Sequence, residues 1–146
     1  MISLVANNLI IPEIILRSTI SISTNLLYSY KYLLSLSHTD IILKDILKQN
    51  DLLADMLVIR TYVIEKDKLN IHLNESIKIC LQNLNRTLTE IENIINSITH
   101  KLQIHKTLWF HNFRSYNISE EKSQLPFLIE KLKHRFELLI KISSIS

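Results

Sequence analysis

The sequence predicts an all-α protein, an antiparallel four-helix bundle with a long central heptad helix and a short aromatic elbow. Four segments carry apolar residues at helical spacing, one of them as an unusually long heptad series, and the 146 residues include no glycine. Tight β-hairpins depend on Asn-Gly or Asp-Gly turns, so a chain without glycine is a poor candidate for a sheet. At this length, residues 1–146 are expected to form a single domain with its own core.

The first segment is apolar, and Glu13 and Arg17 are its only charged residues before Lys31. Pro12 is expected in the first turn of a helix, where its missing N–H costs nothing. A helical face then follows at Ile15, Ile22, Leu26, Leu33 and Leu36. Residues 18–24 alternate Ser or Thr with Ile, which also fits a short strand, but we favour a helix. The charge-free run 18–30 is shorter than the ~20 apolar residues of a membrane-spanning helix.

The second helix is expected after residues 37–40, Ser-His-Thr-Asp, which break the pattern and supply helix-capping side chains. It should continue to about residue 67. Its apolar positions are Ile42, Ile46, Leu53, Leu57 and Ile64. Residues 67–74 form the next break, and Asn74 is the expected cap of the third helix.

The third helix has the strongest pattern in the chain. Its apolar residues alternate at spacings of four and three without interruption, at Ile77, Leu81, Leu84, Leu88, Ile91, Ile95, Ile98 and Leu102. This spacing is typical of a helix that packs along its length against other helices. The flanking positions lack the complementary charges of a dedicated zipper, so we favour the inner face of a monomeric bundle over the seam of a dimer.

An aromatic elbow follows the third helix. We predict that Trp109, Phe110, Phe113 and Arg114 bind a partner, because aromatic and arginine anchors dominate protein interfaces. At the corner of a bundle, however, aromatic side chains more commonly close the open end of the core, and that alternative stays open. Residues 117–123 are expected to form a loop. The last helix should open at Pro126, with its apolar face at Leu128, Leu132, Phe136, Leu139 and Ile142.

No catalytic, cofactor or metal motif is present in the sequence. A P-loop, a GxGxxG turn and a nucleophile elbow all need glycine, so no enzyme activity, cofactor or small-molecule substrate is expected. His100, His105 and His111 do not have the i,i+4 spacing of a helical zinc pair. Asp51 and Asp55 share a helix face, but no second motif completes a metal site, and a solvated face explains them better.

Charge and cysteine content indicate which partners and which location to expect. The net charge of +3 comes from residues 105–146, where basic residues alternate with acidic ones, a pattern that disfavours nucleic acid as a partner. The single cysteine, Cys80, cannot form an intrachain disulfide, and no secretory signal is evident, so an intracellular, cytoplasmic location is expected, with peripheral membrane association as an option. Abundant Ile, Lys and Asn beside few Gly, Ala, Val and Pro indicate an AT-rich genome.

The order of parts from Leu73 to Ile142 resembles the four-helix bundles of cell-death executioners, of the mixed-lineage-kinase-like and fungal HeLo type. A long heptad helix runs into an aromatic and basic elbow at 108–114, and a leucine-rich helix follows. The resemblance implies self-association and membrane disturbance, with the first helix engaging lipid. The residues themselves favour a non-enzymatic protein-interaction or assembly module, and the membrane-engaging bundle is the alternative.

Overall fold

The computed structural model is all-helical in the residues that it describes, which confirms the predicted all-α class. It describes residues 2–36, 41–49, 52–69, 73–108 and 117–145, and 95% of these are helical with no strand among them. The helices are α1 (Ile2–Leu36), α2 (Ile41–Gln49), α3 (Leu52–Lys68), α4 (Glu75–Thr107) and α5 (Ser119–Ile145).

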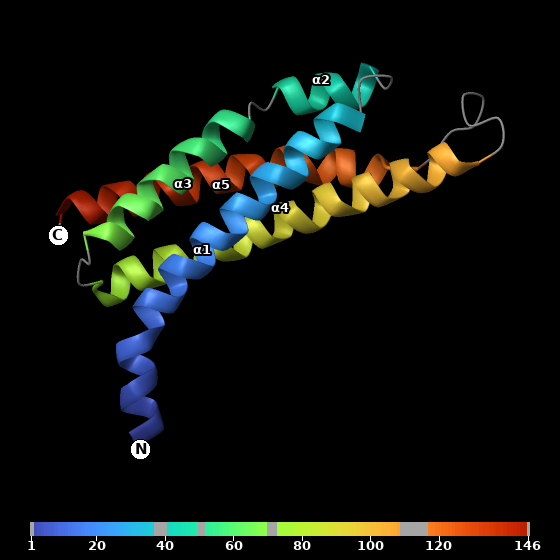
Figure 1. Cartoon of the computed structure of the whole chain (residues 1–146). Coiled ribbons are helices and arrows are strands. Elements are labelled where there is room, and N and C mark those ends of the chain that lie inside the picture. Colours follow the sequence, from blue (N-terminus) through green and yellow to red (C-terminus); the bar gives the residue numbers. More distant parts are fainter. Residues whose placement is uncertain (1, 37–40, 50–51, 70–72, 109–116, 146) are drawn as a thin grey trace.

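The long helix α4 is the centre of the arrangement. Helices α1 and α5 both pack against α4, α1 also packs against α3, and α3 contacts α5 (Figure 1). The N-terminal part of α1 projects away from the other helices (Figure 1). The core lies between α1, α3, α4 and α5, and Leu43 and Leu47 of α2 are buried in it as well.

Helix α4 begins where the sequence predicts. The side chain of Asn74 caps it, because its Oδ1 accepts a hydrogen bond from the backbone N–H of Ile77 at 2.9 Å. All eight residues of the heptad series are buried. On the α5 side, Arg135 donates to the backbone carbonyl of Asn83 at 2.8 Å and also to the hydroxyl of Thr87.

The Ser/Thr-rich stretch of α1 is helical, and its hydroxyl groups are satisfied within the helix. Thr19 and Ser23 are fully buried, and they donate to the carbonyls of Ile15 at 2.7 Å and Ile20 at 2.9 Å. Such back-bonding removes the cost of burying a hydroxyl. The alternation of Ser or Thr with Ile in this stretch therefore does not make a strand.

Polar side chains also connect α1 to its neighbours. Asn85 of α4 donates to Ser18 Oγ at 3.1 Å, and Arg60 of α3 donates to Thr24 Oγ1 at 2.8 Å. The Tyr30 hydroxyl donates to the backbone carbonyl of a residue of α2, Leu47. These contacts fix how α1 lies against three other helices.

The segment predicted as the second helix forms two helices, α2 and α3, so the described residues contain five helices. Asn50 and Asp51, which stand between α2 and α3 in the sequence, both have low helix propensity. The buried face of α3 also differs from the predicted one. Its core residues are Leu52, Met56, Ile59 and Val63, whereas Leu57 is 45% exposed.

Two helices begin earlier than the proline residues suggested. Helix α1 begins at Ile2, so Pro12 is not in its first turn, and α5 begins at Ser119 with Pro126 inside it. Residues 119–123 are therefore helical rather than a loop. Asn117 accepts hydrogen bonds from the backbone N–H and the hydroxyl of Ser119, and Glu120 in the first turn suits the positive end of the helix dipole.

Candidate functional site

The predicted partner-binding residues Trp109, Phe110, Phe113 and Arg114 lie outside the described residues, in the segment 109–116. The structure describes the two ends of this segment. Helix α4 leads into it through Leu108, and Asn117 and Ile118 connect it to α5.

A polar network joins these two ends. Lys101 of α4 forms an ion pair with Glu121 of α5, and it also donates to the backbone carbonyl of Asn117 at 3.1 Å. Ser97 donates to the same carboxylate oxygen of Glu121 at 2.9 Å. Glu121 is 5% exposed, so its charge is compensated by these partners rather than by water. The network therefore holds the last turns of α4 against the first turn of α5.

The surroundings of Glu121 affect its ionisation. Burial raises the pKa of its carboxyl group, but hydrogen bonds from Lys101, a backbone N–H and Ser97 outweigh burial and lower the pKa below the ordinary 4.5. A carboxyl whose folded-state pKa is lowered stabilises the fold above its unfolded-state pKa. This contribution is lost as the pH falls through the folded-state pKa.

We expect Glu121→Gln to lower the free energy of unfolding by about 1–3 kcal/mol at pH 7, since it removes a charged hydrogen-bond acceptor. The difference between the wild type and Glu121→Gln should shrink as the pH falls from about 4.5, where the carboxyl of the unfolded chain takes up a proton, to the lowered folded-state pKa, where the folded wild type takes one up as well. Urea unfolding at several pH values measures this. A difference that stays constant down to pH 2 would contradict the role given to Glu121.

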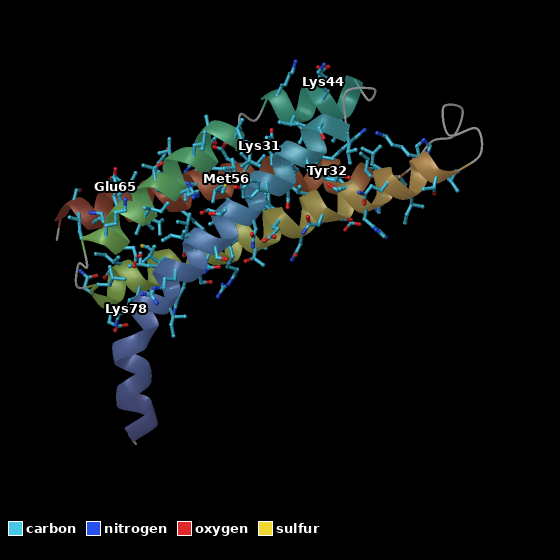
Figure 2. The ribbon with its side chains drawn as sticks, viewed as in Figure 1. Lys31, Tyr32, Lys44, Met56, Glu65 and Lys78 are labelled. Carbon is cyan, nitrogen blue, oxygen red and sulfur yellow. The ribbon has the colours of Figure 1, made fainter. Side chains whose placement is uncertain are left out.

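Apolar side chains are exposed near the same end of the bundle. On α4, Ile104 and Leu108 lie four residues apart and are 49% and 39% exposed. On α1, Tyr28 and Tyr32 lie one turn apart and are also exposed. Tyr32, which Figure 2 labels, accepts a hydrogen bond from Gln103 of α4 at 2.9 Å. Such exposed apolar side chains are candidate contacts for a partner.

The structure also describes four of the other candidate groups, His100, His105, Asp55 and Cys80, whereas Asp51 and His111 lie outside the described residues. His105 is buried whereas His100 is exposed, and among the described residues no three His, Cys, Asp or Glu side chains are placed to hold a metal ion. Asp55 lies 3.8 Å from Lys133 of α5, as an interhelical ion pair. Burial raises the pKa of the Cys80 thiol, which makes it a poor nucleophile. None of the described helices is long and apolar enough to cross a membrane.

A cavity at the other end of α4 is not predicted by any motif in the sequence. Its walls come from α1, α3, α5 and the start of α4, so its residues are far apart in the chain. Their only common signal is the apolar face of each helix, which predicts a core equally well.

Comparison with known proteins gives no relative from which a function could be transferred. No protein-family model matches the sequence, and no curated protein or solved structure matches it with significance.

Proposed function

We propose that this chain is a non-enzymatic, intracellular interaction or assembly module, built as an antiparallel four-helix bundle of α1, α3, α4 and α5. Its partner is a protein or a second copy of the chain. The contact residues are Trp109, Phe110, Phe113 and Arg114. The observation that carries the proposal is the network of Lys101, Glu121 and Ser97, which ties together the helices on either side of the aromatic segment.

Fixing the ends of a recognition segment favours binding. A segment whose ends are already held near each other loses less conformational entropy when a partner orders it than a free chain of the same length does. The exposed Ile104 and Leu108 extend apolar surface up to the first residue of the segment. Trp and Arg are also the residue types most enriched among interface anchors.

We expect Trp109→Ala and Phe110→Ala to weaken partner binding by about 30-fold or more, as loss of an interface anchor does, while the helical content stays unchanged. The full-length wild type and each variant would be immobilised and used to capture proteins from extracts of the source cells. Sedimentation velocity over a range of concentrations would measure self-association, and circular dichroism would measure the fold.

Phe127→Ala is the matched control, because Phe127 is 68% exposed on α5 and lies outside the aromatic segment. A specific partner is one that the wild type and Phe127→Ala retain and that the Trp109 and Phe110 variants lose. If both variants unfold the domain, the aromatic side chains belong to the core and the proposal is wrong. If both bind every partner as the wild type does, the segment is not the contact.

The second candidate is a membrane-engaging, self-associating bundle, and one observation on α1 favours it. The hydroxyls of Thr19, Ser23 and Thr24 all donate to carbonyls of α1 itself. A helix with satisfied hydroxyls pays less to enter lipid than one that leaves them unpaired. Dye release from anionic liposomes by the full-length chain tests this candidate directly. Leakage at a low protein-to-lipid ratio would favour this candidate. The absence of both leakage and co-sedimentation would count against it.

A further inference from the structure

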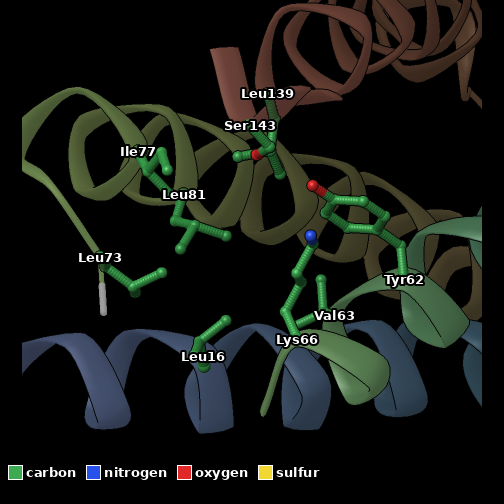
Figure 3. Close-up of a pocket in the computed structure, with 9 residues that line it drawn as sticks. All are labelled: Leu16, Tyr62, Val63, Lys66, Leu73, Ile77, Leu81, Leu139 and Ser143. Carbon is green, nitrogen blue, oxygen red and sulfur yellow. The ribbon is translucent and has the colours of Figure 1, made fainter. Parts of the chain in front are cut away.

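The bundle contains an apolar cavity of ≈160 Å³ at the end where α4 begins (Figure 3). Leu16 of α1, Leu81 of α4 and Leu139 of α5 form opposing walls. Six of the nine lining residues are Leu, Ile or Val, and none is acidic. An engineered cavity of about 150 Å³ with similar walls binds benzene, so this cavity has room for an apolar body of roughly six carbons.

One wall of the cavity carries polar groups from α3. The Tyr62 ring packs edge-to-face on Phe136, with ring centroids 5.5 Å apart, and the Lys66 ammonium group lies 5.2 Å from the centroid of the Tyr62 ring. The Tyr62 hydroxyl and the Lys66 ammonium group point toward the same space, beside Ser143 (Figure 3). These contacts hold the ends of both side chains at one side of the cavity.

The Tyr62 hydroxyl has an unmet hydrogen-bonding capacity. Its oxygen is buried, and no hydrogen-bond partner for it exists among the described residues. A buried hydroxyl without a partner is costly, and such groups in native structures commonly mark a site for water or a ligand. A hydroxyl donor and an ammonium donor that converge in this way suit an acceptor with negative charge.

We propose that this cavity binds a small monocarboxylate with an apolar body of about five or six carbons. The carboxylate accepts hydrogen bonds from the Tyr62 hydroxyl and the Lys66 ammonium group. The hydrocarbon lies among Leu16, Leu81 and Leu139. This site is separate from the aromatic segment, which follows the opposite end of α4, so either proposal can fail without the other.

The test is a titration of the full-length, methyl-labelled protein with hexanoate, followed by NMR. We expect saturable shifts confined to the methyl groups that line the cavity, with a Kd on the order of 0.1–1 mM for a ligand of this size. Hexanoate should bind about 15-fold more tightly than butanoate, because each buried methylene contributes about fourfold. Hexanol, which has the same chain without the charge, should bind at least tenfold more weakly than hexanoate.

Substitutions of Lys66 and Tyr62 test whether each side chain donates to the bound carboxylate. Lys66→Met keeps the apolar stem and should weaken hexanoate at least tenfold while leaving hexanol unchanged, and Tyr62→Phe should weaken hexanoate about threefold to tenfold. Lys68→Met is the matched control, since Lys68 is exposed at the end of α3 and does not line the cavity, and it should bind as the wild type does. Binding that does not saturate, or that Lys66→Met leaves unchanged, would overturn the proposal.

Discussion

Replacing Leu88 with Ala should lower the free energy of unfolding by about 2–5 kcal/mol, the range for a leucine removed from a packed core. Leu88 is 0% exposed in the middle of α4. Alanine has at least as high a helix propensity as leucine, so the loss comes from packing and not from the helix itself. In a domain of this size the midpoint of thermal unfolding should fall by about 5–15 °C. Urea unfolding followed by circular dichroism measures the free energy directly.

Leu138→Ala is the control for this experiment, because it makes the same change at a side chain that is 49% exposed. It should cost less than about 1 kcal/mol, since much of the leucine already contacts water. Similar losses for Leu88→Ala and Leu138→Ala would mean that the eight-residue series of α4 does not form the inner face of the bundle.

Helix α4 shows how much of the fold the sequence can predict. Its series alternates spacings of four and three over 26 residues, from 77 to 102, and no other face of that segment is continuously apolar. The cap is equally local, since Asn74 needs only the backbone N–H of Ile77, three residues away. Such features can be predicted because they depend on neighbours in the chain.

Helix starts are harder to predict from the sequence, because a proline is only weak evidence for the position of a start. A proline is favourable in the first turn, but it does not require that the helix begin there. In α5 the start is set by Asn117 and Ser119, and Pro126 is accommodated in the helix at an exposed position.

The candidate sites also differ in how far the sequence can predict them. The aromatic segment is a run of consecutive residues, so composition alone identifies it. By contrast, the pair of Lys101 and Glu121 joins residues twenty positions apart, and the cavity brings Leu16 near Leu139. Those juxtapositions follow from how the helices pack, which no short motif encodes.

In helix α3, periodicity alone cannot decide which face is buried. Its sequence offers two apolar stripes, one through Leu53, Leu57 and Ile64 and the other through Leu52, Met56 and Ile59. Both have helical spacing, and neighbouring helices decide which one is buried. Packing against α1 and α5 buries the second stripe.

Met56→Ala and Leu57→Ala test this choice at adjacent positions. Met56 is 0% exposed, and its truncation should lower the free energy of unfolding by about 2–5 kcal/mol. Leu57 is 45% exposed, and its truncation should cost less than about 1 kcal/mol. The opposite order of losses would mean that the stripe through Leu57 faces the core. In that case α3 would be rotated by about 100°, the angle between successive residues of a helix, and Tyr62 and Lys66 would turn with it, away from the cavity.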